Sequence, residues 1–378
     1  MIALALLGCD GDLDDTATEP AAETWLLPLP DGFPEPLVPA ENPATPEKFE
    51  YGRHLFYDPR LAGNAAQSCS DCHEPSLSYT DGKVLPEGST GDTIPRNAMA
   101  LVNVAWQASY TWPNPLLTTL EDQLLIPMYN DVPTELGMSG HEDEIAGRLG
   151  ADPVYQELGA AAFPDDDPFE RTSLVYALAT YARGLVSSSS PYDRYTYEGD
   201  RDAMSDAALR GMALFFGEQA ECYHCHSGPN LTASFVSTQS AGLPDAFFNT
   251  GLYNIDGEGG YPTDNRGLIE FSGKPEDMGK FRVPTLRNVA LTAPYMHDGS
   301  VATLTEVIAN YNRGGTLRES GDGATSPYKS ALIHELGLTE QDKADLEAFL
   351  ESLTDDEFVA NEAYGDPWPA DTDTGATE

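Results

Sequence analysis

The chain has 378 residues, with 62 acidic side chains against 20 basic ones and a formal net charge of −42. Such an excess of negative charge repels nucleic acids and anionic membrane surfaces, so the composition excludes both as partners. The length predicts two domains, and the acidic surface is expected either to be simply solvated or to attract a basic protein partner.

The N-terminus is a short apolar run, Met1–Cys9, that ends in Leu-Leu-Gly-Cys. This ending is typical of a bacterial lipoprotein signal cleaved before Cys9, although the run is short and lacks a basic start. We expect residues 1–9 to be this signal and the protein to be periplasmic or in the cell envelope, lipid-anchored at Cys9, with plain secretion as the alternative. Because no other stretch reaches the ~20 apolar residues of a membrane span, the lipid is the only membrane contact expected.

Residues 10–45 are rich in Asp, Glu, Pro, Ala and Thr and predict a flexible acidic linker that becomes ordered near Trp25–Leu27. After it, the pattern Gly-x-x-Leu-Phe-aromatic occurs twice, at 52–57 and at 211–216. The second copy belongs to a helix with Ser205 as a favourable N-cap. Each copy precedes the same five-residue motif, described next.

The motif is Cys-x-x-Cys-His, which attaches a c-type haem. Two thiols on one turn add to the vinyl groups of one porphyrin, and the following histidine, His73 or His226, binds the iron. The four thiols belong to Cys69, Cys72, Cys222 and Cys225. The sequence therefore predicts two covalently bound haem c groups. A zinc site built from the four cysteines is the alternative, and a pair of thioredoxin-like redox motifs is a weaker one.

Helices are the main regular structure that the periodicity predicts, at 173–185, 303–311 and 339–353. Thr339 with Asp342 forms a variant capping box for the last of these. The fold class is therefore mainly α, with two cytochrome c-like haem domains related by internal duplication and with long loops. We place a boundary near Ser187–Pro191. The predicted units are an N-terminal haem domain at 46–190, a C-terminal haem domain at 191–356 and a weakly ordered acidic tail at 357–378.

Several blocks beyond the haem motifs carry a family resemblance. They are Gly52–Leu61, Pro95–Asn97, Leu120–Gln123, Glu135–Gly137, Phe281–Val289 and Leu291–Gly299. Over about residues 48–355 the chain resembles the bacterial di-haem cytochrome c peroxidase family, which includes the MauG enzymes. Within that family, Trp112–Leu117 and Tyr129–Gly137 look most like the methanobactin-associated MbnH enzymes.

The resemblance implies that the two irons differ. The N-terminal haem of the family is peroxidatic and is often blocked by a distal histidine, but no histidine occurs between His73 and His141. Provided that His141 lies outside the pocket, this iron is open to peroxide. At the second haem, Tyr311 stands where many members have methionine, and a phenolate favours oxidised iron. Met296 and His297 are competing ligands, and a simple core aromatic is the other interpretation of Tyr311.

The resemblance also implies roles for residues around the irons. Glu135 matches the carboxylate that moves protons between the peroxide oxygens, with Gln123 as its amide neighbour, whereas Glu121 and Asp131 are expected to be surface or cap residues. Trp112 matches a tryptophan between the haems, where it carries electrons or simply packs.

A calcium ion between the haems is implied as well, bound by Asn97 and by the backbone carbonyls of Thr292 and Pro294. Arg282 and Arg287 are expected to pair with haem propionates, with ordinary surface salt bridges as the alternative.

The predicted function is a peroxidase-type oxidoreductase that uses hydrogen peroxide to form a high-valent di-haem state. That state then oxidises an aromatic residue of a partner protein, with tryptophan converted to kynurenine as the MbnH-like case implies. One alternative is a cytochrome c peroxidase that takes electrons from a small cytochrome or copper protein. A di-haem electron carrier without catalysis is the other.

Overall fold

The computed structural model describes residues 29–368. The predicted signal, Cys9, residues 10–28 of the linker and residues 369–378 of the tail lie outside this range. The helices are α1 Pro46–Tyr57, α2 Leu120–Tyr129, α3 Glu142–Gly150, α4 Pro153–Ala162, α5 Arg171–Arg183, α6 Pro191–Asp193, α7 Asp206–Phe215, α8 Ile269–Ser272, α9 Leu304–Arg313, α10 Glu340–Glu351 and α11 Asp356–Val359. The strands are β1 Phe247–Phe248, β2 Phe281–Arg282, β3 Leu317–Arg318 and β4 Gly321–Asp322.

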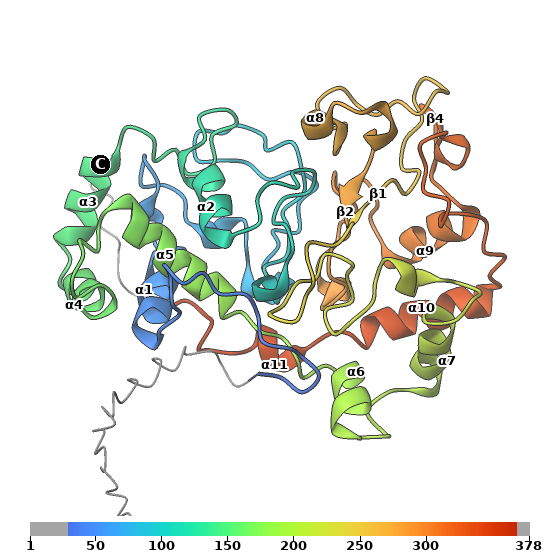
Figure 1. Cartoon of the computed structure of the whole chain (residues 1–378), viewed down its shortest axis with the longest axis horizontal. Helices are drawn as coiled ribbons and strands as arrows, with labels where there is room; N and C mark the ends of the chain where they lie inside the picture. The colour runs from blue at the N-terminus through green and yellow to red at the C-terminus, as the bar shows by residue number, and fades with distance from the viewer. Residues whose placement is uncertain (1–28, 369–378) are drawn as a thin grey trace, which may run out of the picture.

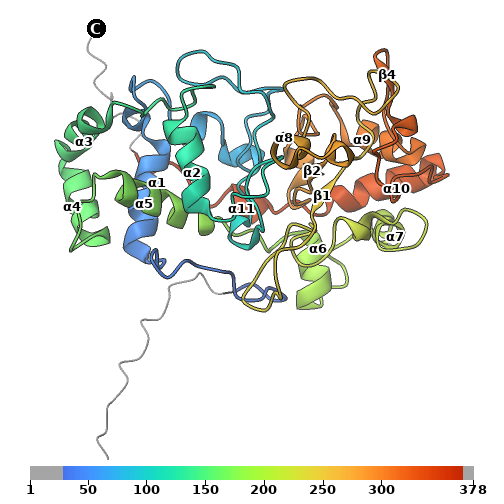
Figure 2. The same ribbon diagram turned by 45° about the horizontal axis from the view of Figure 1, so that its top comes forward.

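The elements form two groups that lie side by side (Figure 1). Helices α1–α5 make up one group and α6–α10 the other, and Figure 2 shows the same separation after a 45° turn. The two antiparallel strand pairs, β1 with β2 and β3 with β4, both belong to the second group. The fold is thus mainly helical with long loops, as predicted. We refer below to residues 46–190 as the N-terminal half and to residues 191–356 as the C-terminal half.

Each half is built on one pair of crossing helices. In the N-terminal half α1 starts at the N-cap Thr45, whose side chain accepts a hydrogen bond from the Lys48 backbone, and packs against α5. In the C-terminal half α7 starts at Ser205, whose side chain accepts from the Ala208 backbone, and packs against α10. The predicted caps at Ser205 and Thr339 are both confirmed.

The repeated glycine explains why both helix pairs cross so closely. A Cβ on Gly52 would lie 2.0 Å from the carbonyl oxygen of Ala177 in α5. A Cβ on Gly211 would lie 1.8 Å from the carbonyl oxygen of Asp345 in α10. Neither distance is possible for real atoms, so only glycine permits the backbones to approach at these two crossings.

Alanine at Gly211 is therefore expected to destabilise the protein. The α7–α10 pair would have to separate, and overpacking of this kind typically costs about 1–3 kcal/mol or more. Unfolding of the holoprotein by heat or denaturant measures the loss. Gly147 in α3 is the matched control, because a Cβ there meets no atom within 4 Å. Gly147→Ala should be neutral or stabilising by roughly 0.5–1 kcal/mol, since alanine favours a helix. Equal losses in both variants would contradict this role of Gly211.

The junction between the halves is buried rather than exposed. Ser187 and Ser190 have no solvent-exposed surface. One carboxylate oxygen of Asp355, Oδ2, accepts hydrogen bonds from the Ser187 hydroxyl and from the backbone N–H groups of Ser188 and Ser189, at 2.8–2.9 Å. The serine-rich segment is therefore fixed to Asp355, the N-cap of α11, more than 160 residues further along the chain.

Within the described residues the linker is ordered beyond Trp25–Leu27, as expected, whereas the expectation of a weakly ordered tail is wrong. Residues 29–45 of the predicted linker pack on the N-terminal half, where the ring of Phe33 lies 4.8 Å from that of Trp106. The indole N–H of Trp106 donates to the Pro34 carbonyl at 2.7 Å. These apolar contacts outweigh the polar composition of the segment.

Residues 357–368 of the predicted tail are also packed. Phe358 and Tyr364 are buried in the core of the N-terminal half. The backbone carbonyl of Tyr364 accepts hydrogen bonds from the hydroxyls of Tyr57, Tyr181 and Tyr79 at 2.8, 2.6 and 3.2 Å. The last described segment therefore completes the first core.

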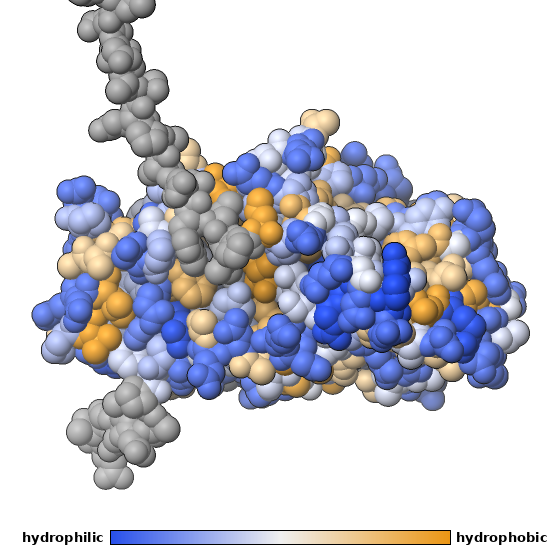
Figure 3. Space-filling model, turned by 90° about the horizontal axis from the view of Figure 1, so that it is seen from below, coloured by the Kyte–Doolittle hydropathy of each residue, from blue (hydrophilic) through white to orange (hydrophobic). Residues whose placement is uncertain are grey.

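The face of the molecule seen from below is mainly polar (Figure 3). Figure 3 shows a largely hydrophilic face with scattered hydrophobic patches. Among residues 29–368 there is no helix whose length and apolar character would let it cross a bilayer.

Candidate functional site

The first Cys-x-x-Cys-His motif follows α1 as a short 3-10 turn, Cys69–Asp71. The Nδ1 of His73 lies 2.7 Å from the carbonyl oxygen of Tyr79. An N–H at Nδ1 donates to this oxygen, which leaves the Nε2 lone pair free for a metal. Burial lowers the pKa of His73 and keeps the ring neutral, as a ligand must be. The structure therefore orients His73 as an iron ligand would be oriented.

Glu135 lies beside this motif in a loop that is fixed on both sides. Its carbonyl accepts from the Ser89 backbone at 2.7 Å, and the next residue, Leu136, donates to the Pro127 carbonyl of α2 at 2.9 Å. Burial raises the pKa of the Glu135 carboxyl to about 7. Burial raises the pKa of the neighbouring Cys69 thiol, and Cys72 and Glu135 add to this rise. A carboxyl with this pKa can both accept and release a proton near neutral pH.

Buried polar atoms without partners surround the same motif. Among the described residues, Gln67 Oε1, Asp81 Oδ2 and Gln123 Oε1 are buried and accept no hydrogen bond. Asp81 is close enough to act on the pKa values of Cys72 and His73. Buried polar groups are normally satisfied, so these atoms fit a site that a further polar group completes. Gln123 was predicted from the sequence, whereas Gln67 and Asp81 were missed because single polar residues in a loop carry no periodic signal.

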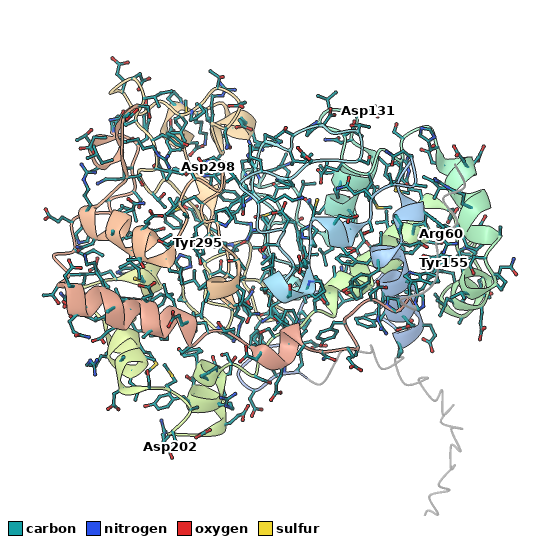
Figure 4. All side chains as sticks on the ribbon, turned by 180° about the vertical axis from the view of Figure 1, so that it is seen from behind. Arg60, Asp131, Tyr155, Asp202, Tyr295 and Asp298 are labelled. Carbon is teal, nitrogen blue, oxygen red and sulfur yellow. The ribbon has the colours of Figure 1, made fainter. Side chains whose placement is uncertain are left out.

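Of the other two acids, Asp131 is a surface residue as expected. The expectation for Glu121 is wrong, because its side chain is 12% exposed in an ion pair with Arg183 and the N-cap of α2 is Thr119. Arg183 donates two hydrogen bonds of 2.9 Å to the carboxylate of Glu121. Asp131 is exposed, at the edge of the molecule in Figure 4. His141 is also on the surface, with 48% of its side chain exposed and Glu144 at 3.2 Å. The prediction that the first iron is open required His141 to lie outside the pocket, and this exposed position meets that requirement.

The second motif opens onto an apolar cavity of about 260 Å³. Cys222, Cys225 and His226 line one side of it, and aliphatic side chains of α9 and α10 line another. The Nδ1 of His226 lies 3.1 Å from the Leu231 carbonyl, so Nε2 is again free. Burial lowers the pKa of His226 to about 4, which keeps this ring neutral at pH 7.

Tyr311 comes from α9 and lines the same cavity. Burial is the main cause that raises the pKa of its phenol, and the nearby thiols of Cys225 and Cys222 add to it. None of the described residues forms a hydrogen bond with the Tyr311 hydroxyl. The competing candidates Met296 and His297 also line the cavity, and Nε2 of His297 is buried without a partner.

Arg282 and Arg287, both predicted to pair with haem propionates, differ in the hydrogen-bond donors that they have left. Arg287 is 2% exposed and forms a bidentate ion pair with Asp193, with both distances 2.8 Å. Its remaining N–H groups donate to the carbonyls of Pro229 and Ser187. All five donors are occupied by groups of the protein, although Arg287 also lines the cavity, so its pairing with a propionate stays a prediction.

Arg282, unlike Arg287, has no carboxylate partner among the described residues and could pair with one. It is 3% exposed and lines the cavity, and within residues 29–368 no carboxylate pairs with it. Its donors reach the Thr111 carbonyl at 3.1 Å, Gln107 Oε1 and the weak acceptor Met99 Sδ at 3.0 Å. Burial lowers its pKa to about 10, so the guanidinium is still charged at neutral pH. A buried cation without a counter-ion fits a carboxylate such as a haem propionate.

The predicted residues between the two haem sites come together at the contact of the halves. The indole N–H of Trp112 donates to the Asn97 carbonyl at 2.9 Å, and the Trp112 carbonyl accepts from the Arg282 backbone at 2.8 Å. Asn97 donates its own backbone N–H to the His297 carbonyl at 2.9 Å. Trp112, Asn97, Thr292 and Pro294 all line the cavity of the second motif.

The residues present fit two porphyrins and do not fit zinc. Each motif offers two free thiols, a neutral histidine with its Nε2 free, and buried polar or cationic groups without partners nearby. In the described part of the chain, no three His, Cys, Asp or Glu side chains are grouped so that they could hold a metal ion. The zinc alternative is therefore excluded there, because a structural zinc site needs four such ligands.

Comparisons with known proteins agree with this fit. Residues 46–202 match the family model described as di-haem cytochrome c peroxidase. The cytochrome-c peroxidase IdrP1 of Denitromonas iodatirespirans is 37% identical, over 90% of this chain and 90% of the relative. The methylamine utilization protein MauG of Methylorubrum extorquens is 34% identical, over 93% and 91%.

A solved structure is similar over nearly the whole fold. It is that of a MauG-like protein associated with microbial copper homeostasis, with 46% identity, a TM-score of 0.88, and coverage of 91% of this chain and 100% of that one. The fold, the two motifs and these relatives lead to one conclusion: the chain belongs to the di-haem cytochrome c peroxidase and MauG family of peroxidase-type oxidoreductases, which carry two haems.

Proposed function

We propose that this enzyme uses hydrogen peroxide to oxidise its haem pair and then oxidises an aromatic residue, with tryptophan the first candidate, of a partner protein. The observation that carries the proposal is Tyr311, a phenol without a hydrogen-bond partner among the described residues that shares a cavity with His226. A phenolate ligand stabilises oxidised iron, which suits a haem pair that must hold oxidising equivalents. The similarity to a MauG-like protein supports the same choice.

When bound, the two covalently attached haems supply the redox chemistry. The chain's own residues hold them and handle protons. Cys69 and Cys72, with Cys222 and Cys225, would attach the haems. His73 and His226 would bind the irons, with Tyr311 as a further ligand at the second site, and Arg282 would neutralise a propionate. Glu135 would accept and release a proton beside the first site, Gln123 would hydrogen bond to bound peroxide, and Trp112 would pass electrons between the sites.

Resting-state electron paramagnetic resonance of the diferric protein tests this assignment. We expect one high-spin signal, from the open site at His73, and one low-spin signal, from the site at His226. Tyr311→Phe should convert the low-spin signal to high-spin, because the sixth ligand is lost.

Tyr295→Phe is the matched control for that test. Tyr295 lines the same cavity but donates its hydroxyl to the Val289 carbonyl at 3.1 Å, so its removal should leave the low-spin signal unchanged. A low-spin signal that survives in Tyr311→Phe would show that another residue is the ligand.

A second candidate function is peroxide reduction with electrons from a small cytochrome or copper protein. Relatives named cytochrome-c peroxidase favour it, as does Met296 in the cavity wall. This function requires a methionine-ligated second haem, which a near-infrared methionine band would reveal. Rapid turnover with reduced cytochrome c would then favour it over partner oxidation.

Three further features belong to the proposal. We infer a calcium ion at Asn97 and the carbonyls of Thr292 and Pro294, all hard oxygen donors, which elemental analysis of the purified protein tests.

We place the protein in the periplasm or cell envelope with a lipid on Cys9, and Cys9→Ser should abolish fatty-acid labelling. We also infer that residues 46–190 and 191–356 are two haem domains that arose by duplication. When the helix pair α1 and α5 is superposed on the pair α7 and α10, Gly52 should then coincide with Gly211.

A further inference from the structure

A half-buried tyrosine near the second cavity is hydrogen bonded to a carboxylate. The Tyr253 hydroxyl donates to Asp298 Oδ2 at 2.6 Å, and the other carboxylate oxygen accepts from the Ser300 backbone at 3.1 Å. The Arg318 guanidinium lies 4.5 Å from the Tyr253 ring centre. Figure 4 shows Asp298 in the C-terminal half, on the same side of the molecule as Tyr295. None of these groups has a role in the function proposed above.

The charge states of the pair are suited to proton transfer from the phenol to the acid. Burial and the Asp298 carboxylate raise the pKa of Tyr253 to about 12, so the phenol is protonated at neutral pH. A tyrosine is oxidised much more readily when its proton has an acceptor at hydrogen-bond distance, because this avoids a cationic phenol radical.

A series of rings connects this pair with the site between the halves. The Trp112 ring lies 6.5 Å from that of His297, which stacks on Phe281 at 3.5 Å. His297 lies 6.4 Å from Tyr261, and Tyr261 lies 5.3 Å from Tyr253. The Tyr261 ring is also close enough to Tyr311 to contribute to the raised pKa of that phenol. Short gaps between aromatic rings favour electron transfer, since tunnelling weakens steeply with distance.

The surface position of Tyr253 completes the series. Tyr261 is 3% exposed, whereas Tyr253 is half-buried and is followed two residues later by the exposed Ile255, at 43%. An electron donor outside the protein can thus reach Tyr253 but not Tyr261.

Four other tyrosines lack one of these properties. Tyr57, Tyr79 and Tyr181 donate to the Tyr364 carbonyl, and a backbone carbonyl cannot hold their protons. Tyr155 does donate to a carboxylate, that of Asp58, at 2.8 Å. Its ring, however, has no solvent-exposed surface, and Figure 4 shows it beside Arg60 at the opposite end of the molecule from Asp298.

We propose that Tyr253, with Asp298 as its proton acceptor, is the surface relay through which the oxidised haem pair removes electrons from the partner protein. This inference rests on the proposed function and identifies the residue at which electrons from the partner enter the enzyme. It predicts that the oxidised residue of the partner docks against Tyr253.

The steps balance for each electron. The oxidised haem pair takes one electron from Tyr253 through Tyr261, and the phenol proton moves to Asp298 as the O–H bond breaks. The resulting neutral tyrosyl radical takes one electron from the aromatic residue of the partner. The proton then returns from Asp298 to the phenol oxygen, and the relay is restored.

The experiment uses the holoenzyme mixed with one equivalent of hydrogen peroxide and no partner. Freeze-quench electron paramagnetic resonance should show a tyrosyl radical that narrows when the tyrosines are deuterated. Trapping with a nitroso compound followed by mass spectrometry should locate an adduct on Tyr253. In Tyr253→Phe this adduct should be lost, while the oxidised haem spectrum forms at the wild-type rate. Because a positioned proton acceptor contributes a rate factor of roughly 10²–10⁴, decay of that spectrum should slow by at least about tenfold.

Asp298→Asn and Tyr155→Phe separate the relay from a structural effect. Asp298→Asn retains the Tyr253 ring but should slow its oxidation and remove the solvent isotope effect on the decay. Tyr155→Phe deletes a comparable phenol–carboxylate bond far from the relay and should behave as wild type. A wild-type protein that forms the oxidised spectrum without an adduct on Tyr253, or an unchanged decay in Tyr253→Phe, overturns the relay and leaves the proposed function standing. A wild-type protein that forms no oxidised spectrum with peroxide overturns the proposed function, and the relay with it.

Discussion

Glu135→Gln is expected to slow the reaction of the diferric protein with hydrogen peroxide by roughly 10²–10⁴-fold, the usual contribution of a positioned acid–base group. Glutamine has nearly the same size but cannot accept the peroxide proton. The loop geometry should survive, because the hydrogen bonds that fix it involve the backbone of Ser89, Glu135 and Leu136. Stopped-flow absorbance after mixing with peroxide measures the rate.

The same reaction should depend on pH in the wild-type protein. Burial raises the pKa of Glu135 to about 7, so the carboxylate form that accepts a proton is lost as the pH falls through 7. The rate should therefore rise with pH around this value and level off above it, and Glu135→Gln should remove the dependence. Asp131→Asn, at an exposed acid in the same loop, is the control and should keep both the rate and the pH profile. A profile that is unchanged in Glu135→Gln would assign proton transfer to another group.

Asp193→Ala is expected to lower the free energy of unfolding by about 3–5 kcal/mol, because it leaves the Arg287 cation buried without its partner. Both side chains are 2% exposed or less. Arg287 also holds the Pro229 and Ser187 carbonyls, so the loss should loosen the loop after the second haem motif and the junction of the halves. Denaturant unfolding of the holoprotein measures the effect.

The double variant Asp193→Ala with Arg287→Met distinguishes a buried charge from a general packing defect. Removing both charges should cost less than the sum of the single losses, because neither charge is then left alone. Arg313→Met is the control, since the Arg313–Asp322 pair is partly exposed, at 39% and 33%, and such pairs contribute about 0–1 kcal/mol. Additive losses in the double variant would contradict the role of the ion pair.

Local patterns predicted the helical framework well. The repeated glycine pattern and the caps at Ser205 and Thr339 depend on residues a few positions apart, and the structure places each where the pattern indicated. The junction was harder, since Ser187–Pro191 has the composition of an exposed linker. It is buried because Asp355, more than 160 residues away, accepts its hydrogen bonds. No local pattern reveals such a partner.

In the candidate site, too, some residues could be predicted from the sequence and others could not. Motif spacing and family resemblance identified the residues that line the cavity of the second motif, Tyr311 and Arg282 among them. They gave Arg282 and Arg287 the same role, although only Arg287 has a buried acid, Asp193, within reach. The Tyr253–Asp298 pair was missed because it joins two loops 45 residues apart in sequence.

The chain's last described segment also has a consequence for the order of events during synthesis. Phe358 and Tyr364 fill the core around the first haem motif, and the Tyr364 carbonyl receives three of that core's tyrosine hydroxyls. A polypeptide is made N-terminus first, so the N-terminal half lacks these two side chains until the C-terminal half has been made. The core around the first Cys-x-x-Cys-His motif therefore closes only after both halves are present.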